Sequence, residues 1–117
     1  MSLSHVKPEN IELIREDSNN LSFRQLTNAN SHGPDVSLTW VEINGAHRSL
    51  VTNKSTRVYY LLEGSFVFKV FPKNQILACA GDIIVIPRSQ EYSFLGSGKY
   101  LVINGPAFQE GDDIYQA

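Results

Sequence analysis

Short runs of β-branched, aromatic and aliphatic residues, separated by turn residues, are the feature that most limits how this chain can fold. Alternation with a period of two is clearest where Val36, Leu38 and Trp40 alternate with Ser37 and Thr39. Such alternation predicts a half-buried strand, and helical spacing is nearly absent from the chain. About ten such runs follow one another at intervals of roughly 8–12 residues, which is typical of an antiparallel sandwich or barrel. We therefore predict an all-β fold, a small antiparallel β-barrel.

Turn residues set the bounds of the predicted strands. Asn44-Gly45 ends the strand that begins at Val36, and Gly64 ends the strand over residues 57–63. Gly96-Ser97-Gly98 separates a strand at residues 92–95 from another at 100–103. Further strands are expected at residues 21–26, 66–71, 76–78 and 83–86. The run 57–63 is apolar on both faces, so both faces are expected to be buried. The barrel interior would bury one face and a second subunit the other.

Length and charge narrow the class of protein. A chain of 117 residues fits one domain, close to the common size of roughly 100–150 residues. We expect a single domain over residues 1–117, with the barrel at about 36–104, an N-terminal arm at 1–20 and a C-terminal tail at 105–117. The net charge of −2 gives no general attraction to nucleic acid or to an anionic membrane, so neither is an expected partner.

The distribution of apolar residues and cysteine indicates the compartment. No apolar run reaches the roughly 20 residues that span a bilayer. The first ten residues are polar and do not form a signal peptide, so we expect a cytoplasmic location. The one cysteine, Cys79, excludes an intramolecular disulfide and is expected to be a small buried hydrophobe.

Two segments resemble the motifs of the cupin superfamily. Residues 57–64 read Arg-Val-Tyr-Tyr-Leu-Leu-Glu-Gly, like the end of the first cupin motif, and residues 81–87 read Gly-Asp-Ile-Ile-Val-Ile-Pro, like the start of the second. The resemblance covers about residues 40–104. It implies a small single-domain cupin of the RmlC-like type, which is a jelly roll or double-stranded β-helix.

The same resemblance implies that the family's metal ligands have been replaced. Counting from the motif glycines, the metal-binding glutamate falls on Arg57 and the third histidine on Tyr92. The first two histidines fall near Val51 and Asn53, or on Leu50 and Thr52. A divalent metal site needs imidazoles and carboxylates that converge on one point, and a permanent cation at Arg57 would repel the ion. We therefore predict a protein without a metal or another cofactor.

The resemblance also gives the candidate ligand-binding residues. Alternation of the family's ligands implies that Asn53, Arg57, Tyr59 and Tyr92 line the barrel mouth or its interior. The planar guanidinium of Arg57 either binds an anionic ligand or pairs with an internal acid, because a buried unpaired charge is costly. The acids considered for that pairing are Glu91, Glu42 and Glu63.

The tyrosines and the nearby histidine allow more than one role. Tyr59 and Tyr92 either contact a ligand, act as acids or pack in the core with satisfied hydroxyls. His47 is also a candidate ligand-binding residue, although a lone histidine near this motif is expected more often at the rim or surface than as a ligand or a base in the pocket. No catalytic residue is assigned.

Three functional classes remain open. The first and favoured class is a metal-free module that binds a small anionic or carbohydrate-like ligand in the barrel. The second is a metal-independent isomerase or epimerase that acts on a sugar nucleotide, and the third is a dimeric structural or interaction protein. The surroundings of His47 distinguish them, because an enzyme of the second class needs a base in the pocket. In each case we expect a homodimer.

Overall fold

The computed structural model describes residues 3–116, and strands dominate it. Eight strands in this part of the chain join in one sheet in the order β1-β2-β3-β7-β4-β5, with β6 beside β4 and β8 beside β3. Every pairing is antiparallel. Their bounds are β1 Ile14–Glu16, β2 Leu21–Gln25, β3 Ser37–Thr52, β4 Thr56–Val70, β5 Asn74–Cys79, β6 Ile83–Ile86, β7 Tyr92–Gly105 and β8 Asp113–Tyr115. The predicted all-β, antiparallel class is confirmed.

Within residues 3–116, helical structure is confined to three short segments. The α-helix is α1 (Ala29–His32), and the 3-10 helices are η1 (Pro8–Asn10) and η2 (Asp17–Asn19). Among the described residues, no helix is both long and apolar enough to cross a membrane.

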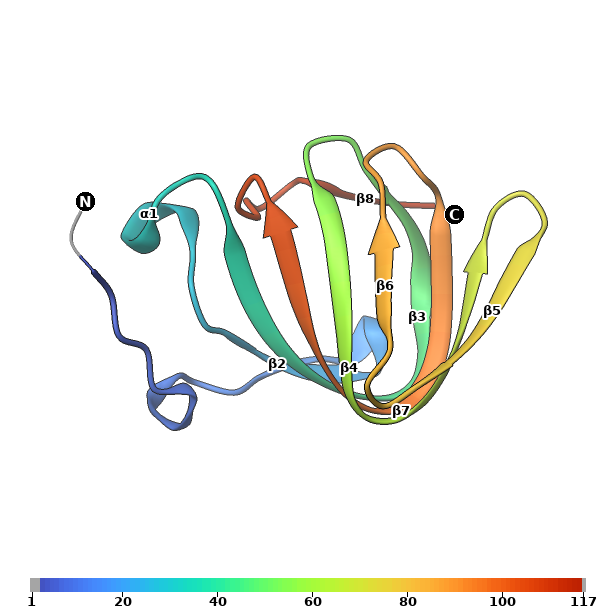
Figure 1. The fold of residues 1–117 in the computed structure, drawn as a ribbon, viewed down its shortest axis with the longest axis horizontal. Helices are drawn as coiled ribbons and strands as arrows, with labels where there is room; N and C mark the ends of the chain where they lie inside the picture. Colours follow the sequence, from blue (N-terminus) through green and yellow to red (C-terminus); the bar gives the residue numbers. More distant parts are fainter. Residues whose placement is uncertain (1–2, 117) are drawn as a thin grey trace.

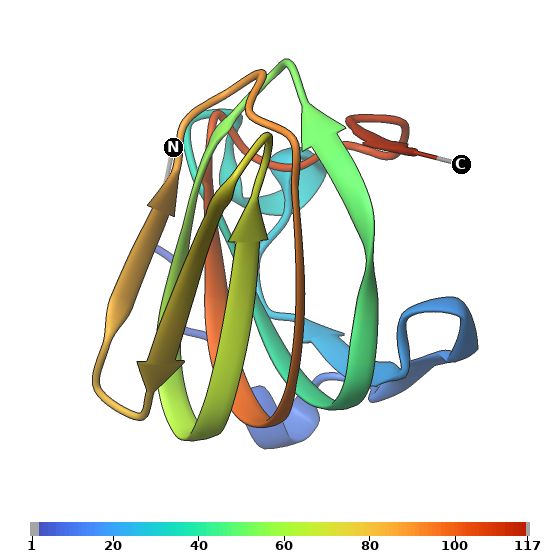
Figure 2. The same ribbon diagram turned by 90° about the vertical axis from the view of Figure 1, so that its right-hand side faces the viewer.

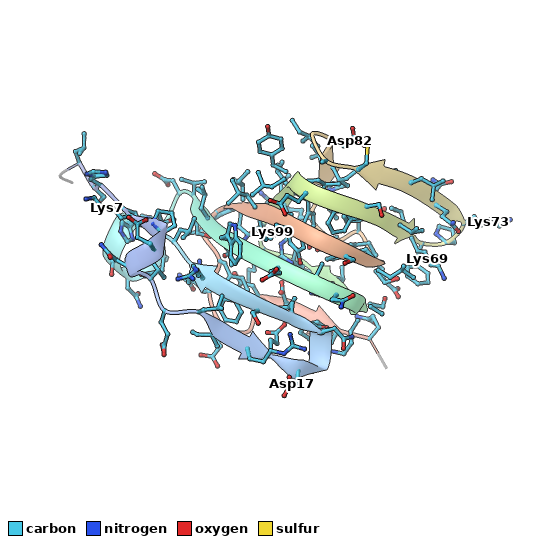
Figure 3. All side chains as sticks on the ribbon, turned by 90° about the horizontal axis from the view of Figure 1, so that it is seen from below. Lys7, Asp17, Lys69, Lys73, Asp82 and Lys99 are labelled. Carbon is cyan, nitrogen blue, oxygen red and sulfur yellow. The ribbon has the colours of Figure 1, made fainter. Side chains whose placement is uncertain are left out.

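Three long strands, β3, β4 and β7, bend together and close the barrel at one end (Figures 1 and 2). The predicted strand ends at Gly45 and Gly64 and the predicted break at 96–98 are therefore wrong. Each of these glycine segments is instead the point where one continuous strand turns through the bend. Seen from below in Figure 3, β2, β3, β7 and β4 lie side by side across it.

Glycine is required at the bend because two backbones approach each other closely there. Gly64 pairs with Gly98 across β4 and β7 and has a φ of +91°. A Cβ atom at Gly64 would lie 1.9 Å from the carbonyl oxygen of Ser97. Glycine adopts positive φ at little cost and leaves room for this approach, so a residue expected to end a strand permits it to continue.

Strand alternation places an aromatic core inside the barrel. Tyr59, Phe68, Phe94 and Tyr100 are almost completely buried. The rings of Phe68 and Phe94 stack with centroids 4.7 Å apart, and Tyr59 packs edge-on against Phe94 at 5.3 Å. Offset and edge-on packing of this kind adds to the free energy gained by burying the rings. It gives the site a rigid floor.

One sequence expectation about burial is corrected by the structure, and burial along β6 is uneven. Cys79 is exposed, not buried, because its side chain points away from the barrel near the end of β5. On β6, Ile86 is buried, whereas Ile83 and Val85 are more than half exposed. The fully apolar run 83–86 is thus core on one face only.

Candidate functional site

A cavity of about 130 Å³ opens beside the aromatic core at the unbent end of the barrel. Its walls come from β1 and β2 on one side, the inner faces of β3, β4 and β7, and the C-terminal segment. The side chains that line it are those of Glu16, Leu21, Phe23, Gln25, Thr39, Val41, His47, Arg57, Tyr59, Tyr100, Val102, Asn104, Phe108, Asp113 and Tyr115. Pockets for drug-sized ligands begin at roughly 300 Å³, so this cavity suits a small ligand or one part of a larger ligand.

Arg57 is buried at the cavity wall and uses all three of its nitrogens. Its Nε donates to Asn104 Oδ1 at 2.7 Å, its Nη1 to the Tyr92 hydroxyl at 3.2 Å, and its Nη2 to Asp113 Oδ1 at 2.6 Å. Burial by itself lowers the pKa of Arg57, but Tyr92, Tyr59 and Asp113 outweigh it and raise that pKa above its ordinary value. The guanidinium therefore stays charged.

The acid that pairs with Arg57 is Asp113, which the sequence interpretation did not consider. Glu63 instead lies 3.5 Å from Lys99, and Glu91 accepts a hydrogen bond from Ser49 Oγ, while Glu42 is exposed. Asp113 begins β8, which pairs with the end of β3 so that Asp113 lies beside Thr52. In Figure 1, β8 crosses the open end of the barrel. The C-terminal tail, treated as peripheral in the sequence, thus completes the site.

Tyr59 and Tyr92 form a buried hydroxyl pair behind Arg57. Their oxygens are 2.5 Å apart, and both side chains are almost completely buried. Burial raises the pKa of each phenol, most strongly that of Tyr59. Both hydroxyls therefore remain protonated near neutral pH, and either one can donate the hydrogen bond that joins them. Tyr59 also lines the cavity, whereas Tyr92 supports Arg57 from behind.

His47 lines the same cavity, not the surface as expected. Its ring is buried and stacks on Phe94 with centroids 4.8 Å apart. Burial lowers the pKa of His47 below its ordinary value, against the opposing effects of the Arg48 carbonyl, Glu16 and Asp113. The neutral imidazole is therefore the main form near pH 7.

One hydrogen bond fixes the tautomer of this neutral imidazole. The Nδ1 atom lies 2.9 Å from the carbonyl oxygen of Arg48. A carbonyl oxygen only accepts, so Nδ1 carries the proton and Nε2 carries the lone pair. Within residues 3–116, no hydrogen-bond partner of Nε2 is found. His47 thus presents a free basic nitrogen.

The third charged side chain at the cavity is Glu16, on β1. Its Oε2 accepts from Asn19 Nδ2 at 2.7 Å, and the same Nδ2 lies 3.1 Å from the Tyr115 hydroxyl. The guanidinium of Arg48 in turn lies over the ring of Tyr115, with the Arg48 Cζ atom 3.8 Å from the centroid of that ring. These contacts tie the N-terminal arm to β8, so two segments outside the central barrel frame the site.

The chemistry of the lining side chains does not fit a divalent metal ion. Where the cupin motif carries a glutamate ligand, Arg57 places a buried cation. No group of three or more histidine, cysteine, aspartate or glutamate side chains gathers for metal binding in the described part of the chain. Ligands of those types must converge on one point to hold such an ion.

The structure brings together most, but not all, of the residues singled out from the sequence. Arg57, Tyr59 and His47 line one cavity, and Tyr92 contacts two of them. Asn53 is exposed, accepts a hydrogen bond from Ser89 Oγ and is not among the residues that line the cavity. The residues missed are Glu16, Gln25, Thr39, Asn104, Asp113 and Tyr115.

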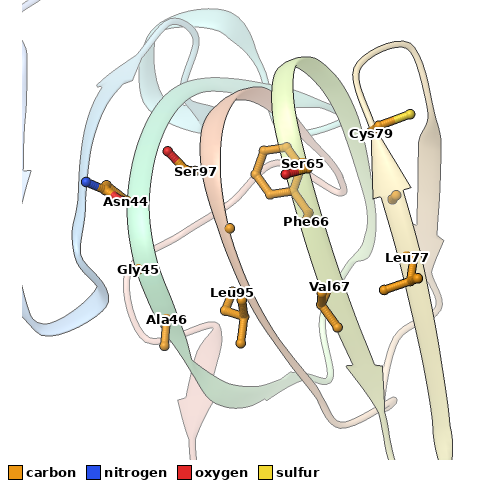
Figure 4. Close-up of a pocket in the computed structure, with 12 residues that line it drawn as sticks. Asn44, Gly45, Ala46, Ser65, Phe66, Val67, Leu77, Cys79, Leu95 and Ser97 are labelled. Carbon is orange, nitrogen blue, oxygen red and sulfur yellow. The ribbon is translucent and has the colours of Figure 1, made fainter.

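A larger hollow of about 860 Å³ lies on the outer face of the sheet (Figure 4). It is open and mainly apolar, with Ala46, Val67, Leu77 and Leu95 on its surface and Cys79 at one end. Its polar side chains are those of Asn44, Ser65 and Ser97, and none of its lining residues is charged, whereas the inner cavity brings charged groups together. The smaller inner cavity is therefore the better candidate site.

The bent barrel and its inner cavity define a protein with the cupin fold. Among solved structures, the chain is similar to PAC13 from Streptomyces with uridine, with a TM-score of 0.86 at 19% identity over 99% of this chain and 92% of that one. It is also similar to an RmlC-like cupin from Shewanella frigidimarina, with a TM-score of 0.75 at 17% identity over 93% and 96%. A third similar structure is KdgF from Halomonas, with a TM-score of 0.77 at 12% identity over 90% of this chain and 96% of that one. The cupin-type jelly roll expected from the sequence is confirmed.

Two further comparisons do not assign the chain to a family. No protein-family model and no curated protein matches the chain. PAC13 is described as a unique nucleoside dehydratase. Its structures with uridine include one with a histidine replaced by glutamine and two with a tyrosine replaced by phenylalanine.

Proposed function

We propose that the inner cavity binds a small, hydroxyl-rich, nucleoside-like or carbohydrate-like molecule and that His47 acts on it as a general base, without a metal. The observation that carries this proposal is the free Nε2 of a neutral imidazole on the wall of a cavity that also presents Tyr59 and Arg57. A general base needs an unprotonated nitrogen within reach of the ligand's proton. The substitutions of a histidine and two tyrosines in PAC13 with uridine support the same choice of residue types.

The surrounding charges suit a base that becomes a cation. When Nε2 takes a proton from a carbon of the ligand, the imidazolium that forms faces the carboxylates of Glu16 and Asp113, which favour the charged ring. The Tyr59 hydroxyl, still protonated, can donate a hydrogen bond to a developing oxyanion. Proton abstraction of this kind begins both the loss of water and an epimerisation, so either reaction fits the same residues.

The test of this function combines binding with turnover. The unfolding temperature should rise with uridine, because a ligand that binds only the folded state stabilises it. Nucleosides and sugars that carry a carbonyl group are then incubated with the protein in D₂O, and mass spectrometry follows the loss of water or the gain of deuterium. His47→Gln should slow this reaction by about 100-fold, while His5→Gln, an exposed histidine, serves as the control.

The dependence of the reaction rate on pH provides a second test of His47 as the base. The base acts only when unprotonated, so the rate should rise through the pKa of His47, which burial sets below its ordinary value. The rate should then be level at neutral pH and fall on the acid side. Binding of uridine without any mass change across the panel would favour the binding module over the enzyme.

We also propose a homodimer that forms through the outer face of β6, β4, β7 and β3. Adjacent outward residues there form two apolar rows, Ile83-Tyr60-Leu101-Trp40 and Val85-Val58-Ile103-Leu38. Ile83 is 61% exposed and Val85 59% exposed. Contiguous apolar patches of this kind mark interaction surfaces, and a two-fold pair would use the same patch twice. The cytoplasmic location stays a prediction.

Charge on this face should separate the subunits. The wild-type protein should show twice the 13.1 kDa mass of one chain in light scattering at micromolar concentration. The double variant Tyr60→Lys and Ile83→Lys should shift it to the mass of one chain, because a buried unpaired charge is costly. Leu77→Lys, on the separate outer hollow, is the matched control. A wild-type mass near that of one chain would contradict the dimer.

A further inference from the structure

The charge of the inner cavity depends on one residue of the C-terminal segment. Among the described residues, the charged side chains that line the cavity are Glu16, Arg57 and Asp113. The lining thus holds two carboxylates and one guanidinium, beside a His47 ring that burial keeps neutral. Arg48 is exposed and stacks on Tyr115 at the rim, outside the lining. A cavity with this balance repels anions.

Arg57 would be an anion site if Asp113 did not occupy it. A guanidinium is suited to bind phosphate or carboxylate groups, and the side chain of Arg57 is only 5% exposed. Its Nη2 already donates to Asp113 at 2.6 Å, and its Nε and Nη1 donate to Asn104 and Tyr92. Asp113 is therefore an internal carboxylate in the place that the carboxylate or phosphate of a ligand would take.

We propose that Asp113 sets ligand specificity by charge, so that the cavity accepts uncharged, hydroxyl-rich molecules and rejects those with a phosphate or carboxylate group. This inference rests on the proposed function and narrows its ligand class to nucleosides and free sugars, against nucleotides and sugar phosphates. Only one oxygen of Asp113 is used by Arg57, so the other can accept from a ligand hydroxyl. Glu16, Thr39 and His47 supply further acceptors around the same cavity.

The inference replaces the anionic ligand expected from the sequence. That expectation rested on a buried Arg57 with either a ligand or an internal acid as its partner. The structure supplies the internal acid, and with Glu16 the carboxylates exceed the cation. Like charges brought together disfavour binding, so an anion should bind this cavity more weakly than an uncharged molecule with the same sugar.

The experiment uses three probes on the full chain: uridine, uridine 5′-monophosphate and inorganic phosphate, measured by calorimetry and by unfolding temperature. The wild-type protein should bind the monophosphate at least about tenfold more weakly than uridine and should not bind phosphate. Asp113→Asn keeps an oxygen for Arg57 but removes the charge. This variant should gain phosphate binding and bind the monophosphate about tenfold more tightly than the wild type does.

Three further variants locate the effect. Asp112→Asn removes the same charge one residue away, where the side chain accepts from the backbone N–H of Gln109, and should leave the preference unchanged. Adding Arg57→Gln to Asp113→Asn should abolish the gained phosphate binding. Circular dichroism of each variant confirms the fold, and Glu16→Gln provides a second carboxylate removal that should shift binding in the same direction.

The outcomes separate this inference from the proposed function. Equal wild-type affinity for uridine and its monophosphate would overturn the inference, as would a gain in Asp113→Asn that persists without Arg57 or no gain at all. If the wild-type protein binds no uridine and Asp113→Asn still gains phosphate through Arg57, the control of charge by Asp113 stands and the nucleoside-like ligand falls.

Discussion

Replacing Gly64 by alanine is expected to destabilise the folded protein by more than about 4 kcal/mol, a loss comparable with the whole stability of many small domains. Gly64 has a φ of +91°, and an added Cβ would meet the Ser97 carbonyl oxygen at 1.9 Å and the Ser97 carbonyl carbon at 2.8 Å. Both atoms belong to the backbone of β7, which is paired on both sides. Relief of the clash would therefore require separation of β4 from β7. Urea unfolding followed by circular dichroism measures the loss.

Gly81 offers a matched control for this prediction. Its φ is +94°, nearly the same, but no atom lies within 4 Å of the position that a Cβ would take. Gly81→Ala should therefore lose only about 1–2 kcal/mol, the cost of the left-handed backbone alone. Equal losses at the two positions would mean that the close approach at the bend is not what requires glycine.

The same bend shows why the strands were predicted but their lengths were not. Alternation in residues 36–40 depends on local side chains, whereas the inward face of Arg57 and Tyr59 was implied by the resemblance to the cupin motifs. The glycine at 64 is compatible with a turn or with a bend in a continuous strand. The difference depends on Gly98, 34 positions further along the chain, which faces Gly64 in the sheet. The residues near Gly64 in the sequence do not indicate that it pairs with Gly98.

The placement of His47 follows from the same error. Val41 and Ile43 point inward, and the period of two continued through Gly45 reaches His47. A strand that ends at Gly45 does not extend this alternation to His47, and a lone histidine near the first motif favours a rim or surface position. The signal was therefore present in the sequence, and a strand continued across the glycine would have placed the histidine in the cavity.

Asp113 could not be identified in this way. The need for a partner at a buried arginine was correct, but the partner lies 56 positions away in a three-residue strand. The tail is polar and lacks a run of apolar residues, so nothing local ranked Asp113 above Glu42, Glu63 or Glu91. Only the pairing of β8 with β3 brings Asp113, and not one of these glutamates, to Arg57.

This ion pair gives the second large prediction, that Arg57→Met lowers the free energy of unfolding by about 3–5 kcal/mol. Methionine fills much of the volume but leaves the Asp113 carboxylate, the Asn104 amide oxygen and the Tyr92 hydroxyl without their donor. A buried polar group that loses its partner costs more than the bond contributed. The measurement is urea unfolding of the wild-type protein and the variant under the same conditions.

The matched control is the pair formed by Arg15 and Asp17, which has a similar distance of 2.8 Å but side chains that are 55% and 90% exposed. Arg15→Met should lower stability by less than about 1 kcal/mol, because water screens an exposed pair. A double variant, Arg57→Met with Asp113→Leu, should recover much of the loss, since an apolar pair avoids the unpaired charge. If Arg57→Met costs no more than Arg15→Met, Arg57 is not the centre of a buried network, and the exclusion of anions by Asp113 loses its structural basis.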